Sequence, residues 1–123
     1  MSAHFIPFTE HNDNTSDAWF GGILGYWAGI RAWKALALQV VDDDDLYQAL
    51  KDPNGFVMPD TIKEFADRLR DLDTNTMVLP YYLDYLPRTP SEAQDAWIRD
   101  CAARLKEVIL DCAEKGRGIL HFH

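Results

Sequence analysis

The C-terminal third of the chain carries the pattern that most limits its fold. A capping box, Thr89-Pro90-Ser91-Glu92, supplies a hydroxyl cap, a proline at the first helical position and a nearby glutamate. Apolar residues then recur at helical spacing up to Gly116, a residue type that commonly ends helices. Gly118–Phe122 is predicted to be a closing strand. The predicted buried stripe of the helix is Trp97, Cys101, Leu105, Val108, Ile109 and Cys112.

A second strand is predicted at the other end of the chain, over His4–Phe8, before a polar loop. If the terminal strands pair, His4 could approach His121 and His123 and form a zinc-like cluster. The sequence does not settle whether the three histidines meet. Strand histidines that face solvent are the default interpretation, so no metal site or other cofactor is predicted.

Helical patterns fill most of the interval between these strands. Residues 17–38 predict one glycine-rich helix, or two helices with a break near Gly21-Gly22 or Gly25. A short helix is expected over residues 46–51, capped by Asp43 or Asp44. A clear amphipathic helix begins at Pro59 and runs to about Asp73. Residues 74–90 are predicted to be irregular because they contain several prolines.

These elements predict one domain over residues 1–123 with an α+β fold. A small sheet that includes the terminal strands would be packed by three or four helices. The apolar run over residues 18–30 is too short to span a bilayer, and no signal peptide is recognised at the N-terminus. Cys101 and Cys112 are too far apart along one helix to form a disulfide. We therefore expect reduced, buried thiols and a cytoplasmic protein.

The formal net charge of -8 limits the classes of partner. An acidic surface repels phosphate backbones and anionic membranes, whereas it attracts a basic protein. The run Asp42, Asp43, Asp44 and Asp45 is therefore a candidate docking patch, although a plain capping and solvating run is the simpler interpretation. The candidate partner-binding residues are Asp42, Asp43, Asp44, Asp45, Tyr81, Tyr82 and Tyr85.

No catalytic motif is recognised. The sequence contains no G-x-S-x-G elbow and no P-loop, and both cysteines lie on the predicted buried face of a helix. No catalytic residue is predicted. Whether the protein is an enzyme stays open, and the lack of a motif favours a non-enzymatic role.

Three segments resemble the YfbM-like family of uncharacterised bacterial proteins. They are Asp17-Ala18-Trp19-Phe20-Gly21-Gly22-Ile23-Leu24, then Phe56-Val57-Met58-Pro59-Asp60-Thr61-Ile62, and residues 105–122. In the first, the family's lysine is missing and Gly21 replaces a histidine. The second implies a strand followed directly by a helix. Residues 105–122 alone also resemble the end of barstar, an acidic ribonuclease inhibitor. The YfbM-like family has no established activity, so this resemblance implies no function.

Two functions are consistent with the sequence. The first is a bacterial or phage inhibitor or immunity-type protein that occludes a basic site on its target, which could be a toxin or a nucleic-acid-binding enzyme. The second is a small enzyme or ligand-binding protein with an aromatic-lined pocket. The acidic balance and the lack of a catalytic motif favour the first. The oligomeric state is not predicted.

Overall fold

The computed structural model describes residues 4–8, 26–51, 55–77, 79 and 92–122. Within them the strands are β1 (His4–Phe8), β2 (Gly55–Val57) and β3 (Gly118–Phe122). The α-helices are α1 (Tyr26–Ala37), α2 (Asp44–Leu50), α3 (Pro59–Leu69) and α4 (Glu92–Glu114), and the 3-10 turns are η2 (Leu38–Val40) and η3 (Thr74–Thr76). The predicted α+β class is confirmed.

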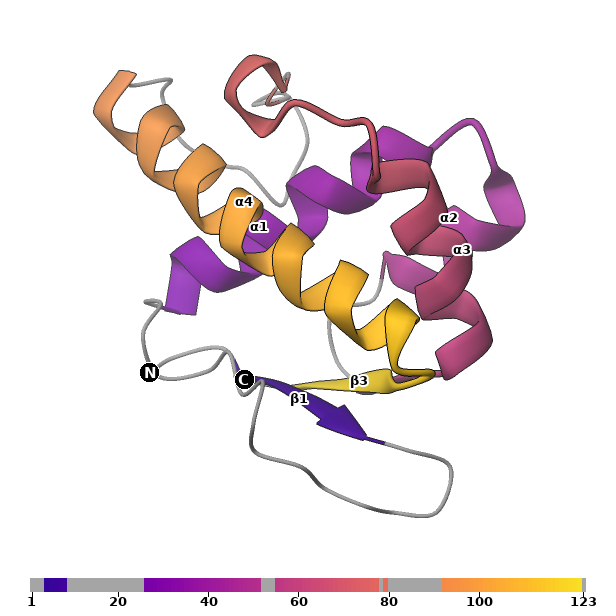
Figure 1. Ribbon diagram of the computed structural model, residues 1–123. Helices are drawn as coiled ribbons and strands as arrows, with labels where there is room; N and C mark the ends of the chain where they lie inside the picture. Colours follow the sequence, from indigo (N-terminus) through magenta and orange to yellow (C-terminus); the bar gives the residue numbers. More distant parts are fainter. Residues whose placement is uncertain (1–3, 9–25, 52–54, 78, 80–91, 123) are drawn as a thin grey trace.

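The sheet is antiparallel, with strand order β1-β3-β2 and β3 at its centre. Phe8 pairs with Gly118 at one end of the β1–β3 ladder, and His4 pairs with Phe122 at the other. The two chain ends thus form adjacent strands. The prediction that both belong to the sheet is confirmed, and the structure shows the pairing that the sequence left open. The helices lie on one side of the sheet in Figure 1, so the fold has two layers.

The core lies between these layers, and Trp33 of α1 is at its centre. Its ring stacks on Phe5 of β1 at 5.8 Å between centroids and meets Phe65 of α3 edge-on at 5.6 Å. Its indole Nε1 donates a hydrogen bond of 2.8 Å to the carbonyl oxygen of Leu50, at the end of α2. One buried side chain therefore joins three helices and a strand.

Helix α3 begins as predicted but ends earlier. Pro59 lies in its first turn, and Ile62, Phe65, Ala66 and Leu69 form its buried face. The helix ends at Leu69 instead of near Asp73. The carboxylate of Asp73 accepts a hydrogen bond of 3.0 Å from the backbone N–H of Asn75, which starts η3 instead. A local side-chain cap thus outcompetes continued helix.

Helix α4 ends as predicted, with Gly116 in the left-handed region at a φ of 68°. The N–H of Arg117 donates to the carbonyl of Cys112 at 2.8 Å, and the N–H of Gly116 donates to Ala113 at 3.3 Å. This pair of bonds is a Schellman motif, and it satisfies carbonyls that the helix end leaves free. The chain then enters β3 directly.

The buried stripe of α4 was predicted wrongly at its first position, and the predicted Val108 is only partly buried. Trp97 is 51% exposed, and its neighbour Ile98 is buried at 2%. Successive helical residues point about 100° apart, so a shift of one residue moves a side chain from the face to its edge. The residues of this helix that are buried in the core are Ile98, Cys101, Ala102, Leu105, Ile109 and Cys112.

The helical prediction for the N-terminal half falls partly outside the described residues. Residues 17–25 are not described, so α1 as seen begins at Tyr26, and whether residues 17–38 form one helix or two stays open. Within the described ranges, no helix has both the length and the apolarity needed to cross a membrane.

Candidate acidic interaction surface

The four aspartates at positions 42–45 are all exposed, and they surround the start of α2. Asp43 is the N-cap, and its Oδ1 accepts a hydrogen bond of 3.3 Å from the backbone N–H of Leu46. Asp44 Oδ1 accepts a long hydrogen bond of 3.5 Å from the Nε2 amide of Gln48. Negative charge in a first helical turn is also favoured by the helix dipole. Part of the run therefore stabilises α2 locally.

Arg68 of α3 binds the first two of these carboxylates. Its Nη2 donates to Asp42 Oδ1 at 2.5 Å, and its Nη1 lies 4.0 Å from Asp43 Oδ2. This hydrogen bond from Arg68 holds the pKa of Asp42 below its ordinary value. Asp42 and Asp43 are therefore partly neutralised inside the fold. The side chain of Asp45 forms no hydrogen bond or ion pair with another described residue.

The predicted tyrosine part of the site cannot be placed beside the aspartates. Tyr81, Tyr82 and Tyr85 lie outside the described residues. Their role in partner binding stays a prediction.

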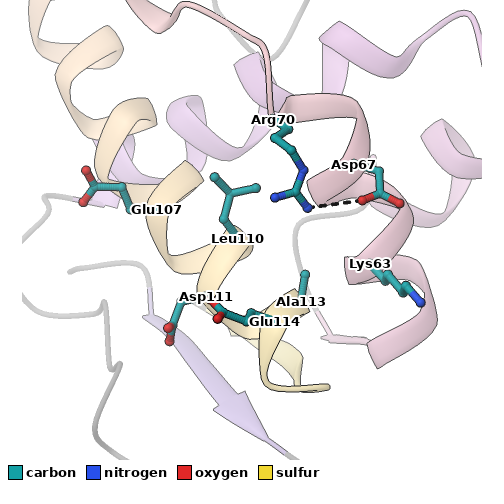
Figure 2. A pocket seen from close by; sticks show the side chains of 8 residues that line it. All are labelled: Lys63, Asp67, Arg70, Glu107, Leu110, Asp111, Ala113 and Glu114. Atoms are coloured by element: carbon teal, nitrogen blue, oxygen red, sulfur yellow. Dashed lines mark hydrogen bonds and ion pairs between the residues drawn. The ribbon is translucent and has the colours of Figure 1, made fainter.

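A groove between α3 and α4 is the cavity that sequence reasoning missed (Figure 2). Its volume is about 530 Å³. The floor is formed by Leu110 and Ala113, which pack against the core. The remaining lining residues are Lys63, Asp67 and Arg70 from α3 and Glu107, Asp111 and Glu114 from α4.

The charges in this groove are only partly paired. Arg70 Nη2 lies 3.3 Å from Asp67 Oδ1 on the same wall, and Asp111 Oδ2 lies 3.2 Å from Lys115 Nζ, one turn along α4. Lys63, Glu107 and Glu114 form no ion pair with any other residue that the structure describes. The α4 wall therefore presents two carboxylates whose charge is not neutralised.

Two half-buried cations of α4 hydrogen-bond to backbone carbonyls of the preceding segment. Lys106 Nζ donates to the carbonyl oxygens of Leu72 at 2.7 Å and Arg70 at 3.3 Å, where it satisfies groups just beyond α3. Arg99 Nε donates to the carbonyl oxygen of Met77 at 3.1 Å. These bonds hold Arg99 and Lys106 against the preceding segment, whereas Arg104 of the same helix is exposed and pairs with Asp100.

The remaining reactive groups do not suggest catalysis. Cys101 and Cys112 are free and buried, and burial raises the pKa of each thiol to about 11, so thiolate is scarce near neutral pH. The prediction of buried thiols is confirmed. Backbone register pairs His4 with Phe122 and His121 with Phe5, and His123 is not described. Among the described side chains, no three His, Cys, Asp or Glu residues are grouped closely enough to hold a metal ion.

The chain was compared with protein-family models, curated proteins and solved structures, and none of them matches. The resemblances to the YfbM-like family and to barstar therefore stay predictions.

The sequence signals this groove only through the spacing of its charged residues. Glu107, Asp111 and Glu114 recur at i, i+4 and i+7, which places them on one face of a helix, and the same spacing holds for Lys63, Asp67 and Arg70. Nothing in these patterns says that the two faces flank a common groove. That information requires the packing of α3 against α4.

Proposed function

We propose that this protein binds a basic protein partner and occludes that partner's basic site, as an inhibitor or immunity-type protein. The observation that carries the proposal is a set of exposed carboxylates whose charge no described cation neutralises. Asp45, Glu107 and Glu114 are exposed and their side chains form no ion pair with a described residue, on a chain with a formal net charge of -8. An acidic surface of this kind attracts cationic proteins and repels nucleic-acid backbones.

Long-range attraction of this kind acts mainly on association. Opposite potentials accelerate encounter, and salt weakens the effect because the Debye length is about 10 Å at 0.1 M and shrinks at higher salt. An inhibitor that must reach its target quickly benefits from such steering. We further propose a cytoplasmic location, supported by the two free, buried thiols.

The alternative, a small enzyme or ligand-binding protein with an aromatic-lined pocket, gains no support from the α3–α4 groove. Its lining residues are charged or aliphatic. Trp33 is fully buried in the core, so it is not available to line a pocket. The other aromatic candidates for such a pocket lie outside the described side chains; they are Trp19, Trp27, Tyr81, Tyr82 and Tyr85.

The proposal is tested by capturing a partner and then measuring its association kinetics. The protein is cross-linked in lysate at low salt, and captured proteins are identified by mass spectrometry and purified. Stopped-flow association with the purified partner is then compared between wild type and an Asp44→Asn/Asp45→Asn variant, which keeps the Asp42–Arg68 ion pair. We expect the association rate to fall by about 3-fold at low salt, with little change in dissociation.

The matched control is Glu64→Gln/Asp71→Asn, which removes two exposed charges from α3 and its C-terminal side. Its association rate reports how much of the effect is net charge alone. An association rate that is insensitive to salt in wild type would contradict the proposal. So would a captured partner that is acidic, or a small molecule that raises the melting temperature when no protein partner binds.

A further inference from the structure

The α4 wall of the groove carries carboxylates, and the α3 wall carries two cations with the carboxylate of Asp67 between them. Glu107 and Glu114 are seven residues apart on α4, and Lys63 and Arg70 are seven residues apart on α3 and its C-cap. Seven residues rise by roughly 10.5 Å along a helix, so both pairs span nearly the same length. The walls therefore form two matched rows.

The two helices run in opposite directions. Helix α4 leads into β3, which pairs with β2, and β2 lies just before α3. At the other end, Lys106 reaches the carbonyl oxygens of Arg70 and Leu72 beyond the end of α3. The end of the groove near Arg70 is therefore also the end near Glu107, and Lys63 and Glu114 share the opposite end.

The opposite charges do not close the groove. Among the described residues no ion pair joins one wall to the other. Arg70 pairs with Asp67 on its own wall, and Asp111 pairs with Lys115. A volume of about 530 Å³ remains between them, above the apolar side chains of Leu110 and Ala113. Matched charged rows on either side of an apolar floor resemble the flanks of a helix–helix seam.

We propose that this groove receives an amphipathic helix of the basic partner. The helix would place Arg or Lys at positions i and i+7 beside Glu107 and Glu114, and an apolar side chain between them over Leu110 and Ala113. This assignment rests on the proposed function, and it names the element of the partner that is recognised. Charge complementarity favours a basic occupant. Glu107 and Glu114, both on the α4 wall, have no described ion-pair partner, whereas Lys63 is the single lining cation in that state among the described residues.

A third helix suits the groove in shape as well as charge. Helices pack side by side with axes about 8–10 Å apart, so one lying along the groove would contact both walls at once. Exposed ion pairs each contribute little to affinity, so the charged rows set register and orientation more than total affinity. The apolar contact with the floor would add the hydrophobic part of the binding energy.

The test uses the whole protein and a synthetic amphipathic peptide of about 18 residues, a length at which an isolated helix can form. The peptide carries two arginines seven residues apart and leucines between them. A control peptide of the same composition has its arginines on different faces. Binding is measured by fluorescence anisotropy at low salt, and amide shifts in NMR spectra show where the peptide contacts the protein.

The decisive variant is Glu107→Gln/Glu114→Gln, which keeps side-chain size and removes only the two charges. We expect it to bind the first peptide about 5-fold more weakly than wild type, in line with the loss of two exposed ion pairs. The matched control is again Glu64→Gln/Asp71→Asn, for which we expect less than about a 2-fold change. Thermal melting of each variant confirms that the fold is retained.

Three outcomes would overturn the groove assignment. They are equal weakening by both double variants, equal affinity for both peptides, and amide shifts concentrated around Asp44 and Asp45 instead of the groove. Each would leave the salt-dependent capture of a basic protein untouched, so the broader function is judged separately by the kinetics of the captured partner. Absence of peptide binding to wild type would also reject the helical occupant.

Discussion

At the scale of single residues, burial decides which reactive side chains can act. The thiols of Cys101 and Cys112 lie on the buried face of α4, and desolvation raises the pKa of each to about 11. In contrast, Asp42 is exposed, and its pKa is lowered by the hydrogen bond from Arg68. Burial therefore keeps both thiols protonated near neutral pH, and the hydrogen bond from Arg68 favours the charged form of the Asp42 carboxylate.

We predict that both cysteines react with a thiol reagent only as fast as the protein opens, because the native thiols are buried and protonated. A Gln48→Cys variant, which adds a thiol at an exposed position of α2, is the control and should react quickly. Protonated Cys101 and Cys112 also make the free energy of unfolding depend on pH. Their stabilising contribution is fully present below the ordinary thiol pKa of 9.0 and is lost as pH rises through about 11. Rapid labelling of native Cys101 or Cys112 would contradict this.

At the scale of elements, helix and strand ends are held by specific contacts. Gly116 ends α4 through a Schellman motif, and Asp43 starts α2 through a side-chain cap. Lys106 reaches from α4 to the carbonyls after α3, so one helix stabilises the end of another. The Arg68–Asp42 ion pair similarly links α3 to the chain just before α2. These contacts hold the acidic surface in place.

Gly116→Ala should destabilise the protein by about 1 kcal/mol, because a Cβ is disfavoured at a φ of 68°. No atom lies within 4 Å of the position that a Cβ would take, so the loss comes from backbone strain and not from a clash. Gly116→Asn should lose less, since asparagine tolerates this conformation better. Urea unfolding measures both variants. Equal stability of wild type and the alanine variant would show that the left-handed cap contributes nothing.

At the scale of the whole molecule, one core couples the helices to the sheet. Trp33 contacts Phe5 of β1 and Phe65 of α3, and it hydrogen-bonds the end of α2 at Leu50. Leu105 and Ile109 of α4 belong to the same cluster of buried residues. The charged rows of the groove are positioned by this core, because α3 and α4 keep their relative placement only while their buried faces remain packed.

Trp33→Phe should therefore destabilise the protein by about 2–4 kcal/mol, since it leaves a cavity and an unsatisfied carbonyl at Leu50. Trp97→Phe is the matched control, because Trp97 is 51% exposed and its truncation should cost well under 1 kcal/mol. Denaturant unfolding monitored by far-UV circular dichroism measures both changes. Similar losses for the two variants would contradict the central role assigned to Trp33.

The sequence by itself determined the features that depend on neighbouring residues. These include the start of α3 at Pro59, the end of α4 at Gly116, the terminal strands and the cap of α2. Such features follow from backbone geometry and hydrogen bonds within one or two turns of chain. The aspartate run is also a local feature, because its four carboxylates are consecutive in the sequence.

Only the tertiary structure decided which distant groups meet. Asp42 and Arg68 are 26 residues apart, and Lys63 and Glu114 belong to helices that the sequence could not align. The early end of α3 and the exposed Trp97 were likewise set by competing contacts and by the rotation of α4 against the core. The relative placement of helix faces depends on burial summed over the whole chain, and a local pattern does not contain that sum.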